Sequence, residues 1–212
     1  MKYTKMPKQD AKERILDVAE LLFSNNSFAS VSIRNVTAQA NVNLSAVNYY
    51  FGSKQGLFQA VYVRRATEMN HERLHLLYEA AEKAEKEGRE LSIREILFSL
   101  VTPTIFWLFD QEGGRSDYIK FLARAYLEQA SDMANVLREE VDVFDKFVPY
   151  MMKAKPGLTL EDIYWRIHFI MGTIHHTINH IDRIAMLSNG YCTVGSKEET
   201  RDRVLDYCLN GF

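Results

Sequence analysis

Apolar residues recur at intervals of three and four along most of this chain, and that periodicity limits its fold more than any other feature. Near the N-terminus the stripe runs through Ile15, Leu16, Ala19, Leu22 and Phe23, as it does on one face of an amphipathic helix. No segment of useful length alternates apolar with polar residues, which is the pattern of a half-buried strand. The chain is therefore expected to be all-α.

The first helix has recognisable ends. Asp10, followed by Glu13, predicts a capping box at its start. The sequence Ser-Asn-Asn-Ser over residues 24–27 is a turn signal, because Asn can adopt the left-handed conformation that ends many helices. Phe28, directly after this turn, is expected to lie in the core.

Two short helices and a connecting turn follow. Ser32 is expected to cap the first of them, which Asn41 stops after about two turns. Asn43 is expected to cap the second, over residues 44–50. Because only a few residues separate the two helices, the spacing over residues 32–51 is typical of a helix-turn-helix.

A long helix is expected to start at Lys54, after the Ser53 cap, and to end near Glu87. Glycine and proline pairs punctuate the rest of the chain. The further expected helices cover residues 92–111, 116–130, 131–153, 159–188 and 196–209. This division predicts a helix-turn-helix domain over residues 1–55 and a larger helical domain over residues 56–212.

Charge is distributed unevenly between these parts. The whole chain has 26 Lys and Arg against 28 Asp and Glu, a net charge of -2. Residues 1–64 hold eight basic and four acidic residues, a balance of +4, which leaves 18 basic and 24 acidic residues, or −6, for residues 65–212. A basic unit joined to an acidic one suggests that the N-terminal part meets a polyanion, although a solvated basic tail would give the same count.

Composition excludes several classes of protein. An aromatic content of 12% and the low net charge exclude a disordered chain. The two cysteines form neither a CxxC pair nor a disulfide framework, which favours a reducing, cytoplasmic location. The start of the chain has no apolar signal segment, and the most apolar run is too short to span a membrane, so no membrane partner is expected.

The second helix of the helix-turn-helix motif has side chains suited to DNA. Asn48 can pair with adenine, and Leu44 can contact a thymine methyl group. Arg34 can reach a phosphate or a guanine, whereas hydroxyl groups and a lysine suit phosphate oxygens. The candidate DNA-binding residues are Ser32, Arg34, Asn43, Leu44, Ser45, Asn48, Tyr49, Tyr50 and Lys54.

The stretch ERILDVAELLF…VSIRNVTAQANVNLSAVNYYFGSKQGLFQAV resembles the DNA-binding domain of the TetR family of transcriptional regulators over residues 9–69. Its most specific piece is NYYFGSKQGLF. The resemblance implies that residues 44–50 enter the major groove, that Lys54 contacts phosphate and that Arg34 contacts a base or a phosphate. Asn41 and Ser27 depart from the pattern, because the family usually has Gly at both positions; Asn tolerates the left-handed conformation better than Ser does.

Two C-terminal segments, RAYLEQ (124–129) and YWRIHFIMGTIHHTI (164–178), are similar to the PsrA-like, fatty-acid-responsive subgroup of that family. This resemblance implies a pocket for a long acyl chain, as a free acid or a coenzyme A thioester. The alternative effector within the family is an aromatic cation, as in multidrug sensors, which would require buried acidic residues.

An acyl chain needs an apolar cavity between helices, and its head group needs a hydrogen-bond donor. Leu97, Leu100, Leu108, Leu122 and Ile174 are further possible lining residues. The candidate ligand-binding residues are Trp107, Phe121, Arg124, Arg166, His168, Met171 and His175. The alternative is that apolar residues at helical spacing are simply core.

Neither a metal site nor a cofactor nor enzymatic activity is expected. His71 with His75, and His176 with His180, have the i, i+4 spacing of zinc-binding helices, but no HExxH motif or third ligand accompanies them. The chain also lacks a GxSxG elbow, a P-loop and a GxGxxG motif. A helical metal-dependent enzyme with an incidental three-helix N-terminus is the alternative from another class.

One short recognition helix reads only a few base pairs, so a two-fold pair on a palindromic operator is expected. The family resemblance implies that the helices over 159–188 and 196–209 form the homodimer interface; burial within one subunit is the alternative. The sequence thus predicts a homodimeric repressor of double-stranded DNA operators that responds to a small hydrophobic effector.

Overall fold

The computed structural model describes residues 10–128 and 134–212, and describes only the backbone of residues 123–128 and 134–141. The described residues form helices and no strand, so the all-α prediction is confirmed. The helices are α1 (Ala11–Asn25), α2 (Ile33–Gln39), α3 (Ser45–Phe51), α4 (Lys54–Lys86), α5 (Ile93–Leu108), α6 (Arg115–Glu128), α7 (Ala134–Ala154), α8 (Leu160–His180), α9 (Arg183–Leu187) and α10 (Lys197–Leu209).

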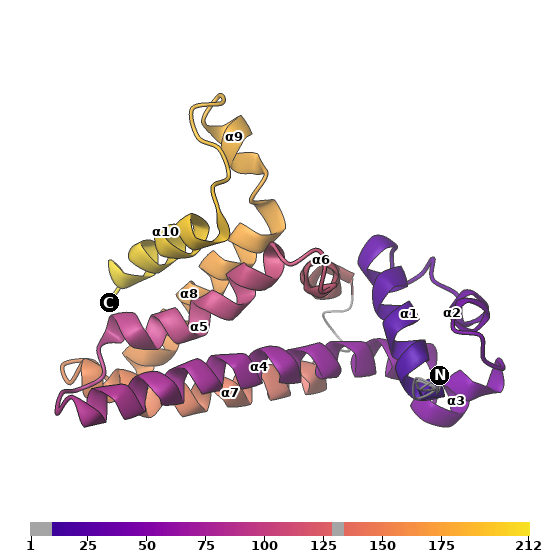
Figure 1. The fold of residues 1–212 in the computed structure, drawn as a ribbon, viewed down its shortest axis with the longest axis horizontal. Helices are drawn as coiled ribbons and strands as arrows, with labels where there is room; N and C mark the ends of the chain where they lie inside the picture. The colour runs from indigo at the N-terminus through magenta and orange to yellow at the C-terminus, as the bar shows by residue number, and fades with distance from the viewer. Residues whose placement is uncertain (1–9, 129–133) are drawn as a thin grey trace, which may run out of the picture.

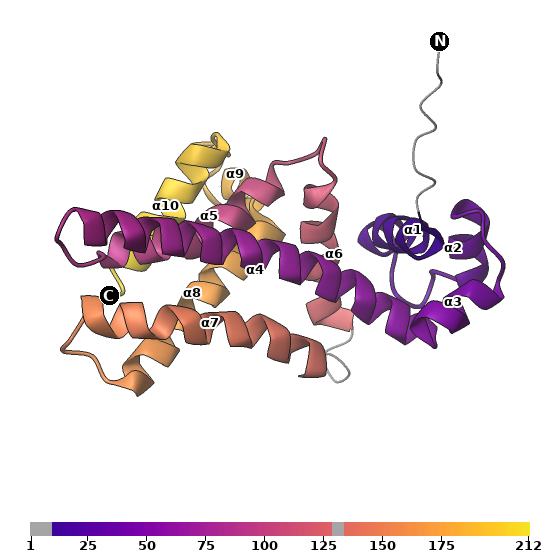
Figure 2. The ribbon, with the colours of Figure 1, turned by 60° about the horizontal axis from the view of Figure 1, so that its bottom comes forward.

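Helices α1–α3 gather at one end of the molecule, and α4 runs from them along the full length of the remaining helices (Figure 1). We call α1–α3 the head and α5–α10 the body. With 33 residues, α4 is about 50 Å long and belongs to both parts. Helix α7 lies beside α4, and α5 packs against α4 and α10 (Figure 2).

Side-chain caps fix the starts of α2 and α4 as predicted. The Ser32 hydroxyl accepts a hydrogen bond from the Asn35 N–H, and the Ser53 hydroxyl accepts one from the Gly56 N–H. Asp10 caps α1 by accepting from the Lys12 N–H, whereas the Glu13 carboxylate pairs with Arg64 instead of completing a capping box.

The prediction that Asn43 caps α3 is wrong. The N-cap residue is Leu44, which makes no side-chain cap hydrogen bond. Asn43 contributes its backbone carbonyl, which accepts from the Ala46 N–H at 2.9 Å. The α2–α3 turn itself is as expected, because Asn41 has a positive φ of 53°.

The single helix predicted over 159–188 is also wrong, because the chain turns after His180 and restarts as α9. The buried stripe of α8 ends at Ile178, and beyond it Met186 and Leu187 are 77% and 75% exposed. A helix gains most of its stability from packing one face, and no such face continues past Ile178. Asn189 and Gly190, both at positive φ, then reverse the chain.

The core runs without interruption from head to body. In the head, Ile15, Phe23 and Val47 are buried; in the body, Leu100 and Ile163 are fully buried. Phe28 is half-buried and packs beside Phe23 and Phe58. No helix within residues 10–128 and 134–212 is long and apolar enough to cross a membrane.

Candidate functional site

Helix α3 has an exposed face that is largely polar and an opposite face that packs against the rest of the head. Val47 is fully buried, which anchors the helix, whereas Tyr49 is 83% exposed and Leu44 is 51% exposed. Ser45 and Asn48 are exposed too. This arrangement leaves hydroxyl, amide and aromatic side chains on the exposed face of α3. A helix that enters the major groove of DNA needs such side chains on its outer face.

A hollow of about 660 Å³ lies between α1, α2 and α3. Of the predicted DNA-binding residues, it brings together Asn43, Ser45, Tyr49 and Tyr50. Ser32 and Arg34 lie exposed at the start of α2, and Lys54 lies at the start of α4. The sequence reasoning missed Arg14, Thr37 and Asn41, which also line the hollow; Arg14 donates from Nε to the Ala40 carbonyl at 3.1 Å.

Lys54 is held in place by the loop that precedes α2. Its Nζ lies 4.3 Å from the centre of the Phe28 ring and 3.4 Å from the Ala29 carbonyl oxygen, to which it donates. Partial burial lowers the pKa of the Lys54 ammonium. The lysine is thus oriented before any ligand arrives.

The acidic residues of the head face away from the α2–α3 surface and toward α4. Arg64 of α4 pairs with Glu13, Asp17 and Glu20 of α1, at 3.3, 2.7 and 2.6 Å. Glu20 has a side chain only 6% exposed and also pairs with Arg65 at 2.9 Å. Because these ion pairs neutralise the carboxylates of α1, the basic residues of the α2–α3 surface have no unpaired acidic residue of α1 to offset them.

The ion pairs continue along α4 toward the body. Arg65 pairs with Glu68, and Glu68 pairs with Arg115 at the start of α6, each at 2.8 Å. Partial burial alone would raise the pKa of Glu68, but the hydrogen bonds from Arg65 and Arg115 outweigh it and lower that pKa. No sequence signal predicts this chain of contacts, since most of the partners lie on different helices.

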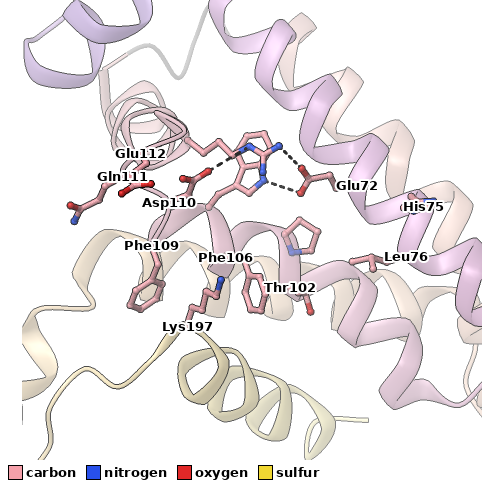
Figure 3. A pocket seen from close by; sticks show the side chains of 13 residues that line it. Glu72, His75, Leu76, Thr102, Phe106, Phe109, Asp110, Gln111, Glu112 and Lys197 are labelled. Atoms are coloured by element: carbon pink, nitrogen blue, oxygen red, sulfur yellow. Dashed lines mark hydrogen bonds and ion pairs between the residues drawn. The ribbon is translucent and has the colours of Figure 1, made fainter.

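A second hollow, of about 740 Å³, lies where α4, α5, α6 and the start of α10 meet (Figure 3). We call it the Trp107 pocket. Arg115 pairs with Glu72 at 2.8 Å and lies 4.8 Å from the centre of the Trp107 ring. The indole N–H of Trp107 donates to Glu72 at 2.9 Å. The lining residues are Glu72, His75, Leu76, Thr102, Pro103, Phe106, Trp107, Phe109, Asp110, Gln111, Glu112, Arg115 and Lys197.

The predicted ligand-binding residues do not converge on one cavity. Trp107 lines the pocket named after it, whereas Phe121 is fully buried in an aromatic cluster, with its ring centre 4.8 Å from that of Phe58. Arg166 and His168 line a groove of about 1020 Å³ formed by α8, α9 and the C-terminal end of the chain.

The other three predicted residues lie on α6 and α8. Met171 and His175 are half-buried on α8. The side chain of Arg124 lies outside the described residues. Several of the other expected lining residues are core, as the alternative held: Leu97, Leu100, Leu122 and Ile174 are buried.

The two histidine pairs differ in their contacts. His75 lies 3.4 Å from Glu79, and the rings of His176 and His180 lie 5.1 Å apart. Among the described residues, no group of three or more His, Cys, Asp or Glu side chains could hold a metal ion.

Two protein-family models match this chain. Residues 15–61 match the family of bacterial regulatory proteins named after tetR, and residues 99–211 match the tetracyclin repressor-like C-terminal domain. The HTH-type transcriptional regulator AcrR of Shigella flexneri is 33% identical over 103 residues, 48% of this chain and 45% of that protein. YttP of Bacillus subtilis, a probable HTH-type transcriptional regulator, is 35% identical over 52 residues, 24% of this chain and 25% of that protein. The chain thus spans less than half the length of these curated relatives.

Solved structures agree in fold. The fatty acid degradation regulator FadR of Bacillus halodurans has a TM-score of 0.63 at 14% identity, with 97% of each chain covered. FadR of Bacillus subtilis, solved in complex with stearoyl-CoA, has the same score and identity over 94% of this chain and 98% of that one. Such low identity shows the fold alone. Because the C-terminal match by itself covers more than half of the chain, the protein belongs to the TetR family.

Proposed function

We propose that this protein is a DNA-binding transcriptional regulator, a repressor that releases its operator when an effector binds to the body. The observation that carries the proposal is the exposed polar face of α3, with Val47 buried behind it. The match of residues 15–61 to the bacterial regulatory family supports the same role.

In this proposal, each side chain on the α2–α3 surface contacts a particular part of the DNA. Asn48 pairs with the Hoogsteen edge of an adenine, and Leu44 packs on a thymine methyl group. Arg34 contacts a phosphate or a guanine. The phosphate-binding residues are Ser32, Asn43, Ser45, Tyr49, Tyr50 and Lys54, which set the register of α3 in the major groove.

The protein acts as a homodimer on a palindromic operator. Helix α8 leaves Trp165 and Phe169 stacked on its surface, 54% and 62% exposed, with ring centres 5.7 Å apart. Tyr207 of α10 is 69% exposed. An exposed apolar face of this extent suits a second copy of the chain, and a two-fold pair places two α3 helices on successive half-sites.

The effector is a small hydrophobic molecule. A long-chain fatty acid or its coenzyme A thioester is supported by the likeness of segments 124–129 and 164–178 to fatty-acid-responsive regulators, and by the shared fold of the FadR–stearoyl-CoA complex. An aromatic cation is favoured by a different observation, the carboxylates and aromatic rings that line the Trp107 pocket.

DNA binding is tested by titrating the protein with duplexes from the region around its own gene, with random DNA as competitor. We expect a competitor-resistant complex whose affinity falls with salt. Asn48→Ala should lose discrimination at particular base pairs, whereas Lys54→Ala should weaken binding to all sequences and reduce the salt slope by about 1. Absence of any complex, or variants that bind operator and random DNA as the parent does, would overturn the proposal.

Native mass spectrometry of the purified dimer tests the acyl effector. Co-purified fatty acid, or a stoichiometric complex with added stearoyl-CoA that lowers operator affinity, is the expected result. A chain that binds neither and keeps its operator in the presence of both has another effector.

A further inference from the structure

Arg115 lies in the Trp107 pocket between an aromatic ring and carboxylates. Its guanidinium group contacts the face of Trp107 and pairs with Glu72 at 2.8 Å, and its Nε lies 3.8 Å from Asp110 (Figure 3). The same group pairs with Glu68 at 2.8 Å. A planar cation between an aromatic face and carboxylates is a recurrent way of binding organic cations. The chain thus fills this position with its own side chain.

Carboxylates outnumber cations around this position. Lys197 also lines the pocket, but its Nζ lies over the Phe106 ring at 4.8 Å. The charged groups that line the pocket are Glu72, Asp110 and Glu112 against Arg115 and Lys197. This excess of one negative charge favours a ligand that brings positive charge.

The wall of the same cavity also contains a residue with an unpaired polar atom. Thr102 of α5 is 7% exposed, and its hydroxyl oxygen has no hydrogen-bond partner within the described part of the chain. The residue lines the Trp107 pocket together with Leu76 of α4 (Figure 3). A buried hydroxyl without a partner is unfavourable, so a movement of this wall that brings the hydroxyl to a polar group of a ligand would be favoured.

We propose that the Trp107 pocket binds an organic cation with a flat aromatic body, which displaces Arg115 from Glu72 and from the face of Trp107. The ring of the ligand packs among Phe106, Trp107 and Phe109, and its cationic end pairs with Glu72. The binding site stands on the pocket itself, whereas its effect on DNA rests on the proposed function.

The displacement of Arg115 can affect the head through a small number of contacts. Arg115 is the first residue of α6, and its ion pairs hold this end of α6 to α4. Two residues later, the Asp117 carbonyl accepts a hydrogen bond from Ser24 of α1 at 2.7 Å. The ligand therefore favours a state in which the start of α6, and with it α1, is less firmly held to α4.

The probe for the site is 4-aminobenzamidine, whose amidinium group imitates the guanidinium of Arg115. Its uncharged control is 4-aminobenzamide, which has the same ring and nearly the same shape. Binding is measured by isothermal titration calorimetry on the full chain without DNA, so that failure of DNA binding does not affect the result.

We expect the amidine to bind at least about tenfold more tightly than the amide, because only the amidine forms a charge-assisted pair with Glu72. Glu72→Gln, which keeps an oxygen for the Trp107 N–H, should weaken amidine binding about tenfold. Arg115→Gln should tighten it several-fold, since the competing internal cation is gone. Glu82→Gln, an exposed change on the same helix, should leave it unchanged.

The gain in Arg115→Gln cannot come from unfolding, which makes this variant decisive. Equal binding of amidine and amide, equal losses in Glu72→Gln and Glu82→Gln, or weaker amidine binding in Arg115→Gln would overturn the proposal. So would tighter binding of benzoate than of the amidine, because Arg115 would then serve an anionic ligand. If the site is confirmed and the amidine leaves DNA affinity unchanged, only the coupling to the head is wrong.

Discussion

The hydroxyl of Ser24 in α1 lies 2.7 Å from the backbone carbonyl oxygen of Asp117 in α6, although 93 residues separate the two in the chain. The same hydroxyl lies 2.7 Å from the Glu20 carbonyl one turn earlier, so its single proton is shared between helix and neighbour. Ser24 is 2% exposed. This contact joins the head to the body at a second place besides the continuous helix α4.

Ser24→Ala should lower the free energy of unfolding by about 1 kcal/mol, because the Asp117 carbonyl loses a buried donor. It should also reduce the change in operator affinity that an effector causes. Urea denaturation and DNA titration with and without effector measure the two effects. Ser30→Ala, at an exposed serine bonded to Ser27, is the control and should change neither.

Glu20→Gln should cost about 2 kcal/mol of unfolding free energy. Its carboxylate is nearly buried and accepts from both Arg64 and Arg65, so the neutral amide leaves two guanidinium groups without their shared counter-charge. Glu13→Gln removes an exposed partner of Arg64 and should cost less than about 0.5 kcal/mol. Similar losses in the two variants would mean that burial of Glu20 contributes little.

The sequence was enough to predict most of the head. Helices α2 and α4 begin at capping serines, so the sequence predicts where each of them starts. The apolar periodicity then predicts which face of each helix is buried. The prediction that Asn43 caps α3 was wrong because asparagine is favoured both as a capping residue and as a turn residue, and the sequence does not distinguish the two. The packing of α1 against α2 and α3 adds Arg14 and Thr37 to the lining of the hollow between these helices.

The body could be predicted only as a set of helices. A periodic stripe shows that residues such as Phe121 face inward, but not whether the space they face is filled by protein or by ligand. The Trp107 pocket depends on Glu72, Asp110 and Arg115, which lie on or beside three different helices and meet only after folding. Their charges look like those of any solvated helix face.

Asn41 should tolerate glycine but not a β-branched residue. Its φ of 53° is strained for most side chains, and Asn and Gly tolerate it best. Asn41→Val should therefore cost about 1–2 kcal/mol, whereas Asn41→Gly should stay within about 0.5 kcal/mol of the parent. Thermal unfolding followed by circular dichroism measures both, and equal effects of Val and Gly would contradict the strained turn.

Glu95 should stabilise the protein in a pH-dependent way. Hydrogen bonding to Arg89 lowers the pKa of this carboxyl from 4.5 to about 2, with Ser92 of the α5 capping box adding to the effect. A carboxyl that is more acidic in the folded state contributes stability above pH 4.5 and loses it as the pH falls toward 2. Glu95→Gln should thus be destabilising at pH 7, with a deficit that shrinks steadily between pH 4.5 and 2. Urea titrations of the parent and of Glu95→Gln across this range measure the deficit, and a deficit that does not change with pH would contradict the prediction.

Phe169→Asp should break the proposed dimer without unfolding the subunit. Phe169 is 62% exposed and stacks on Trp165, so in one chain the substitution removes little buried surface. Between two copies it would place a charge in an apolar interface, which should weaken dimerisation by at least about thirtyfold. Sedimentation equilibrium measures this directly, and operator affinity should fall with it, because each half-site is then bound independently. Tyr78→Asp, at a residue of α4 that is 48% exposed, is the matched control and should leave the dimer intact. A Phe169→Asp protein that stays dimeric would place the interface on another face of the molecule.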